Sequence, residues 1–185
     1  HQLGRNSEAI AVYEGIFDLD PSDTQVLQTL ELLTYGLEDW AAFERVVVRQ
    51  IDALRMSDVP DAHKQLRACF LKLGELYEDI LEDPERSVAN YREALEVNPG
   101  DTDAVAGLDR VCQREGLWDD LVMLLESQLG HVEDETARAN HKIRLAQVLY
   151  QQLDNVDDAL HHLEDVLATA PNHAAAVAQL NELFD

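Results

Sequence analysis

Residues 70–99 read FLKLGELYEDILEDPERSVANYREALEVNP, and this stretch decides the fold of the chain. Apolar residues recur three or four positions apart on both sides of the Asp83-Pro84 pair, which is the spacing of one face of a helix. Asp83 is a favourable helix N-cap, and Pro84 suits the first helical position because the N–H that proline lacks has no helical partner there. The stretch therefore predicts two helices joined by a short turn. The Asn-Pro-Gly segment at 98–100 is predicted to end the second helix.

The same pattern recurs along the chain at a fixed spacing. A gapless shift of 78 residues places Pro21 on Pro99, Asp23 on Asp101, Leu30 on Leu108 and Trp40 on Trp118. A gapless shift of 72 residues places Leu73 on Leu145, Gly74 on Ala146, Leu108 on Leu180 and Pro99 on Pro171. A period of 72 to 78 residues is about twice the 34 residues of a helical hairpin, so each period is expected to contain two hairpins.

The opening stretch also resembles a known repeat. Phe70-x-x-Leu73-Gly74-x-x-Tyr77, followed by Tyr91, Ala94 and Pro99, is similar to the tetratricopeptide pattern, and weaker copies cover the rest of the chain. The resemblance implies an all-α fold, a right-handed superhelical α-solenoid of stacked antiparallel helix hairpins. It also implies that small residues such as Gly74 and Ala146 stand where two helices approach closely. Glu31 and Asp109 occupy that position in two other copies and predict looser hairpins.

Periodicity and boundary residues predict ten helices, at about 5–18, 22–35, 38–54, 60–82, 84–97, 101–115, 117–130, 133–153, 155–169 and 173–184. Asp101 and Asn155, like Asp83, are expected to cap the helices that follow them. The helices group into a single array over 1–185, with a half hairpin at 1–18, complete hairpins at 22–54, 60–97, 101–130 and 133–169, and a half hairpin at 173–185. The segment from Gly4 to Ala9 reads as a turn followed by the start of a second helix. Because neither end shows the polar capping repeat that such arrays need, we expect a fragment of a longer array.

Composition narrows the classes of partner. Acidic residues outnumber basic ones by 37 to 14, and the net charge is −23 at pH 7. A surface of that sign repels a phosphate backbone, so nucleic acid and anionic membranes are poor partners. No apolar run approaches the roughly 20 residues of a membrane helix. Cys69 and Cys112 fall on apolar helix faces, which predicts two buried thiols rather than a disulfide framework.

The sequence shows no catalytic or cofactor-binding motif. It has no Gly-rich phosphate loop, no G-x-S-x-G elbow and no HExxH zinc motif, so we expect neither enzyme activity nor a cofactor. His161 and His162 lie near acidic residues, but neighbouring side chains on a helix point about 100° apart and do not easily share a metal ion. Trp40 and Trp118 stand at equivalent repeat positions and are expected to pack the repeat.

A candidate binding surface follows from the resemblance, which implies that the first helices of successive hairpins line a concave groove. With the phase taken from the repeated leucines, the groove residues are Lys72, Arg110, Gln113, Arg114, Asn140, Arg144, Gln147 and Gln151. Arginine forks fit carboxylates, and amide side chains fit a peptide backbone. The sequence therefore predicts a site for an extended segment with acidic side chains or a carboxyl terminus, attracted by a cationic strip of Arg110, Arg114 and Arg144.

The alternative interpretation of this surface is structural. The same arginines could pair with Glu75, Glu78 and Asp79 across adjacent helices, as surface ion pairs commonly do. The lysine-and-asparagine clamp of chaperone-binding members of the family does not match, so chaperone tails are not implied.

The leading functional hypothesis is a protein-interaction scaffold that binds a peptide or partner protein in its groove. Two alternatives stay open: a structural spacer or self-associating solenoid segment, and a regulatory domain of a larger enzyme.

Overall fold

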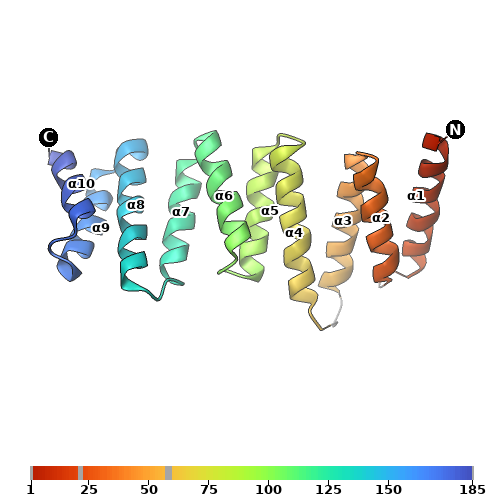
Figure 1. Cartoon of the computed structure of the whole chain (residues 1–185), viewed down its shortest axis with the longest axis horizontal. Coiled ribbons are helices and arrows are strands. Elements are labelled where there is room, and N and C mark those ends of the chain that lie inside the picture. The colour runs from red at the N-terminus through yellow and green to blue at the C-terminus, as the bar shows by residue number, and fades with distance from the viewer. Residues whose placement is uncertain (1, 21–22, 57–59, 185) are drawn as a thin grey trace. The chain divides into compact units, whose positions relative to one another are not determined.

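The computed structural model describes residues 2–20, 23–56 and 60–184, and these residues form ten α-helices and no strand (Figure 1). The helices are α1 (Gln2–Leu19), α2 (Thr24–Gly36), α3 (Trp40–Arg55), α4 (Ala62–Asp79), α5 (Pro84–Val97), α6 (Thr102–Glu115), α7 (Trp118–Leu129), α8 (Glu135–Leu153), α9 (Val156–Thr169) and α10 (Ala174–Phe184). Every helix begins and ends within three residues of its predicted bounds. The predicted all-α fold is confirmed.

Side-chain caps fix where the helices begin. The side chains of Asp83, Asp101 and Asn155 each accept a hydrogen bond from the backbone N–H three residues later, at 3.1, 2.9 and 3.3 Å. Each cap satisfies one of the first N–H groups of a helix, which have no partner inside the helix. All three predicted caps are confirmed.

The chain divides into two compact units: unit 1 (His1–Asn98), with α1 to α5, and unit 2 (Pro99–Asp185), with α6 to α10. Within each unit, successive helices pack side by side and run in opposite directions (Figure 1). Unit 1 contains the hairpins α2/α3 and α4/α5, and unit 2 contains α6/α7 and α8/α9, with α10 packed on both α8 and α9. The predicted antiparallel hairpins are therefore confirmed inside each unit.

The α4/α5 hairpin shows why its sequence is the best copy of the repeat. A Cβ atom added at Gly74 would lie 2.7 Å from Cε1 of Tyr91, closer than real Cβ contacts come. The Ser87 hydroxyl donates a hydrogen bond to the Gly74 carbonyl at 3.0 Å, and the Tyr91 hydroxyl donates one to Glu78 Oε2 at 2.7 Å. The Tyr91 ring fills the space that a side chain at position 74 would need, as predicted for this close approach.

Two hairpins carry an acid instead of a small residue at that position. Glu31 on α2 and Asp109 on α6 correspond to Gly74 on α4 and Ala146 on α8. In each unit the helix pair with the acid packs less extensively than the next pair, which has the small residue. This difference agrees with the looser hairpins predicted from the sequence.

Helix length explains the change in repeat spacing from 78 to 72 residues. The second helix of the first hairpin, α3, has 16 residues, whereas its counterpart α7 has 12. Most of the difference therefore lies in the last turn of α3, and the connection to the next hairpin supplies the rest.

The N-terminal helix begins earlier than predicted. The turn predicted in the segment Gly4–Ala9 is wrong, because α1 runs from Gln2 to Leu19 without interruption. An isolated glycine costs a helix only about 1 kcal/mol, and no proline lies within this segment to end it. Pro21, which the repeat alignment uses as a boundary, lies outside the described residues.

Both cysteines are buried. Cys69 and Cys112 are 1% and 0% exposed and remain thiols, so the prediction of two buried thiols is confirmed. Among the described helices, none combines the length and the apolar character that crossing a bilayer requires.

Candidate functional site

Two ion pairs occupy equivalent positions in the two units. In unit 2, Arg144 Nη2 on α8 donates to Asp109 Oδ1 on α6 at 2.5 Å. In unit 1, Lys72 Nζ on α4 donates to Glu31 Oε2 on α2 at 2.6 Å. The shifts of 78 and 72 residues place Glu31 on Asp109 and Lys72 on Arg144. Each acid therefore holds a cation from the first helix of the next hairpin, and we call these contacts the inter-hairpin ion pairs.

Unit 2 contains a hollow of about 180 Å³ next to its inter-hairpin ion pair, between α6, α7 and α8. The hollow is lined by Gln113, Trp118, Leu121, Arg144, Gln147, Val148, Gln151 and Gln152, and we call it the unit 2 hollow. Four of the eight predicted groove residues line it. The structure thus brings together one arginine and three of the predicted amide-bearing residues.

The lining combines a cation, amide groups and an indole. The Arg144 side chain is 40% exposed and uses one guanidinium nitrogen on Asp109, so its other N–H donors can meet a second acceptor. The half-buried Trp118 adds a large apolar wall with an indole N–H donor. Such a surface can hold a carboxylate, a peptide group and an apolar side chain together.

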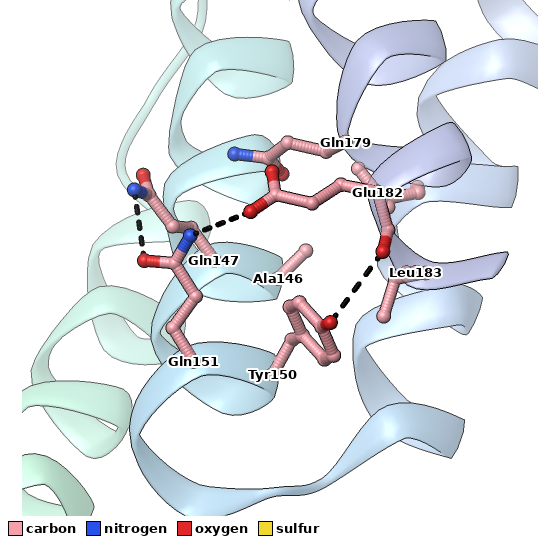
Figure 2. Close-up of a pocket in the computed structure, with 8 residues that line it drawn as sticks. Ala146, Gln147, Tyr150, Gln151, Gln179, Glu182 and Leu183 are labelled. Atoms are coloured by element: carbon pink, nitrogen blue, oxygen red, sulfur yellow. Dashed lines mark hydrogen bonds between the residues drawn. The ribbon is translucent and has the colours of Figure 1, made fainter. Parts of the chain in front are cut away.

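The amides of the hollow are oriented by a chain of hydrogen bonds that reaches the last helix (Figure 2). Gln147 Nε2 donates to Gln151 Oε1 at 3.2 Å, and Gln151 Nε2 donates to Glu182 Oε1 on α10 at 3.4 Å. On the same face, the Tyr150 hydroxyl donates to the Glu182 carbonyl at 3.4 Å. These hydrogen bonds leave Gln147 Oε1 as an acceptor that a peptide N–H can use.

The other predicted groove residues lie elsewhere. Arg110, Arg114 and Asn140 are exposed on α6 and α8 but do not line the unit 2 hollow, and Arg114 Nε donates to the adjacent Glu115 at 2.8 Å. Of the predicted cationic strip, only Arg144 reaches the hollow. Lys72 belongs to unit 1.

The alternative interpretation is that the arginines pair internally, and one such pair is present, at Arg144. Arg144 is paired across adjacent first helices, but its partner is Asp109 rather than Glu75, Glu78 or Asp79. Glu78 is 2% exposed and accepts a hydrogen bond from the Tyr91 hydroxyl. Arg144 is ion-paired but still partly exposed, so Asp109 positions its guanidinium without covering it.

Sequence reasoning misses Asp109 and four residues that line the hollow, Trp118, Leu121, Val148 and Gln152. The repeat pattern marks Asp109 only as a departure from the small-residue position, and Trp118 only as a packing residue. A signal for each is present in the repeat alignment, because an acid recurs at Glu31 and a tryptophan at Trp40. The missing step is the pairing of one hairpin's acid with the next hairpin's cation.

Several other cations join neighbouring helices. Arg86 on α5 lies over the Tyr77 ring, 4.5 Å from its centroid, and donates to Glu44 Oε1 on α3 at 3.3 Å. The Tyr77 hydroxyl also donates to Glu44 Oε1, at 2.7 Å. Burial, followed by this bond to Glu44, raises the pKa of Tyr77. This cluster holds the α4/α5 hairpin against α3.

The histidine pair of α9 is not arranged as a metal site. The rings of His161 and His162 lie 5.9 Å apart, and the nearby Asp165 pairs with Lys142 at 3.0 Å. Within the described ranges, no group of three or more His, Cys, Asp or Glu side chains is placed to hold a metal ion.

In the comparison with protein-family models, one segment of the chain matches a known family. Residues 68–101, which hold most of α4 and all of α5, match the family model described as the tetratricopeptide repeat. A search of curated proteins gives no significant match.

Several solved structures align along most of the chain. YrrB, described as a TPR protein with an unusual peptide-binding site, is 18% identical with a TM-score of 0.43, over 97% of this chain and 86% of that chain. TTC0263, a TPR protein of Thermus thermophilus, is 18% identical with a TM-score of 0.41, over 99% of this chain and 92% of that chain. MamA is 16% identical with a TM-score of 0.44, over 94% of this chain and 87% of that chain. The family match therefore covers the hairpin α4/α5, whose close approach at Gly74 is described above, and shows that this segment is similar to a tetratricopeptide repeat.

Proposed function

We propose that this chain is a protein-interaction scaffold and that the unit 2 hollow holds an extended segment of a partner polypeptide by a carboxylate. The observation that carries the proposal is the convergence of Arg144, Trp118 and four glutamine side chains on one hollow. Stacked helical hairpins present extended surfaces on which such segments can lie.

The size of the hollow favours part of a long ligand over a whole small molecule. Its volume of about 180 Å³ is below the roughly 300–1,000 Å³ of pockets that enclose small molecules. One or two side chains fit such a space. The rest of the segment would lie across the exposed surfaces of α6 and α8.

Arg144 gives the site its selectivity for a carboxylate. Asp109 fixes the guanidinium on one side, and the remaining N–H donors lie in the planar fork that matches a second carboxylate. Hydrogen bonds to charged groups contribute roughly 1.5–3 kcal/mol when shielded. Loss of that contact corresponds to a roughly 10- to 100-fold weaker affinity.

A peptide selection tests the proposal. Random nonapeptides with free carboxyl termini are selected against the chain, and the affinities of the selected peptides are measured by fluorescence anisotropy. We expect enrichment of Asp, Glu or dependence on the terminal carboxylate, and a roughly 10- to 100-fold loss of affinity in Arg144→Gln. Arg138→Gln is the matched control, since it removes the same charge from the same helix, away from the hollow.

Two results would contradict the proposal. Selected peptides without an acidic group, or equal losses in Arg144→Gln and Arg138→Gln, would show that the hollow does not read a carboxylate. If no peptide is selected and sedimentation shows association that rises with concentration, the spacer or self-associating alternative is favoured instead.

A further inference from the structure

Unit 1 contains a second hollow, of about 170 Å³, between α2, α3 and α4. The hollow is lined by Tyr35, Phe43, Lys72, Glu75, Leu76, Asp79 and Ile80, and we call it the unit 1 hollow. Its position next to the Lys72–Glu31 pair matches the position of the unit 2 hollow next to Arg144–Asp109.

The two hollows are equivalent residue by residue. The 78-residue shift places Tyr35 on Gln113 and Phe43 on Leu121, and the 72-residue shift places Lys72 on Arg144, Glu75 on Gln147, Leu76 on Val148, Asp79 on Gln151 and Ile80 on Gln152. Every residue that lines the unit 1 hollow thus has a counterpart in the lining of the unit 2 hollow. The chain therefore presents the same hollow twice, each time between one hairpin and the first helix of the next.

The chemistry of the two linings differs most in charge. Where unit 2 has the amides of Gln147 and Gln151, unit 1 has the carboxylates of Glu75 and Asp79. Both carboxylates are exposed, lie one turn apart on α4, and have no hydrogen-bond or ion-pair partner among the residues described. The single cation of this lining, Lys72, is already held by Glu31 at 2.6 Å. The unit 1 hollow is therefore net negative.

The residues of α2 and α3 that line the unit 1 hollow are aromatic. The rings of Tyr35 and Phe43 meet edge to face with centroids 5.9 Å apart, and Trp40 supports Tyr35 at 5.3 Å. Tyr35 is nevertheless 58% exposed, so its ring remains accessible. Aromatic faces attract ammonium and guanidinium groups, and this attraction adds to that of nearby carboxylates.

We propose that the unit 1 hollow binds a lysine or arginine side chain of a partner polypeptide, between the Tyr35 and Phe43 rings and the carboxylates of Glu75 and Asp79. The two units then select opposite charges with one geometry: unit 2 takes an acidic group, and unit 1 takes a basic one. An acidic side chain is excluded from unit 1 because it would face two uncompensated carboxylates. This inference concerns a different site from the one proposed above and does not depend on it.

The probes are three capped, fluorescein-labelled nonapeptides built from alanine and glycine. At the same two positions, one peptide carries arginines, the second glutamates and the third norleucines. Binding is measured by fluorescence anisotropy to the whole chain and to Glu75→Gln/Asp79→Asn. The matched control is Asp52→Asn/Glu96→Gln, which makes the same two chemical changes on exposed surfaces of α3 and α5 outside the hollow. Thermal melts of the variants check that the fold is unchanged.

We expect the arginine probe to bind best, to lose at least tenfold in affinity in Glu75→Gln/Asp79→Asn, and to change less than twofold in the control. Tyr35→Ala should also weaken it, by roughly threefold or more, through loss of the aromatic face. Equal losses in the two double variants would overturn the proposal, because they would show only diffuse attraction to an acidic protein. Failure of the arginine probe to bind better than the norleucine probe would overturn it too.

The same measurements separate this inference from the proposed function. Arg144→Gln should leave the arginine probe unaffected, whereas Glu75→Gln/Asp79→Asn should leave the acidic peptides selected on unit 2 unaffected. If only the acidic peptides fail to behave as expected, the assignment of the unit 2 hollow is wrong. If only the arginine probe fails, the assignment of the unit 1 hollow is wrong.

Discussion

Arg144 on α8 donates to Asp109 on α6 at 2.5 Å, although the backbones of these two first helices are not in direct contact. The long guanidinium side chain spans the gap and meets an acid that replaces the usual small residue. Lys72 and Glu31 repeat the arrangement in unit 1. The same substitution that loosens a hairpin therefore creates a link to the next one.

A double-mutant cycle measures this link. Arg144→Ala, Asp109→Ala and the double variant are compared by urea unfolding, and we expect a coupling free energy of about 0.5–1 kcal/mol, because both side chains are partly exposed. The same cycle on Arg114 and Glu115, sequence neighbours that pair on the exposed surface, should give a coupling near zero. Equal coupling in both cycles would show that Asp109 does not hold Arg144.

Charge reversal at Arg144 separates stability from binding. Glutamate at position 144 would face Asp109, so we expect Arg144→Glu to lower the free energy of unfolding by about 1 kcal/mol and to abolish binding of acidic peptides. Addition of Asp109→Lys should restore stability but not binding. Thermal melts and anisotropy with the selected peptides check both outcomes.

The close approach at Gly74 predicts a costly Gly→Ala substitution. An alanine Cβ would lie 2.7 Å from Cε1 of the Tyr91 ring, so Gly74→Ala should destabilise the chain by about 1–3 kcal/mol. The control is Gly15→Ala in α1, where a Cβ meets nothing within 4 Å and alanine should stabilise the helix by up to about 1 kcal/mol. If Gly74→Ala stabilises equally, the Tyr91 ring moves freely and the contact is not tight.

Tyr91 also carries a buried hydrogen bond. Its hydroxyl donates to Glu78, which is 2% exposed, so Tyr91→Phe removes a donor from a buried carboxylate and should cost about 1.5–3 kcal/mol. Tyr150→Phe is the control, because that hydroxyl makes only a 3.4 Å bond to the Glu182 carbonyl. Urea unfolding of both variants should show a loss of less than about 0.5 kcal/mol for Tyr150→Phe.

Burial raises the pKa of the Cys69 thiol from 9.0 to about 12, and the nearby Lys72 ammonium only partly opposes this rise. The unfolded chain releases this proton near pH 9 and the folded chain does not, so the contribution of Cys69 to stability falls as the pH rises above about 9. Relative to Cys69→Ala, the native chain should lose about 1 kcal/mol of stability between pH 8 and pH 10. A constant difference over this range would show that the thiol is accessible to water.

Local physics explains how far the sequence could predict this structure. Caps such as Asp83 and Asp101 act on the backbone three residues away, and apolar spacing fixes each helix face, so helix bounds and buried cysteines followed directly. The turn predicted at Gly4 failed because one glycine is a weak helix breaker. The repeat pattern predicts four of the eight residues that line the unit 2 hollow, but the role of Asp109 depends on the separation between hairpins, which no local pattern encodes.

The alternation of acid and small residue also has a mechanical consequence. Within each unit the hairpin that packs less extensively, α2/α3 or α6/α7, is followed by one that packs more extensively, α4/α5 or α8/α9, and we expect the first to be compliant and the second stiff. Tension along a unit should extend the compliant member first, as two springs of unequal stiffness in series do. Each hollow spans the compliant hairpin and the first helix of the stiff one. A partner bound in a hollow, as we propose, should therefore resist this extension, and the force needed to extend the unit should rise when the partner binds.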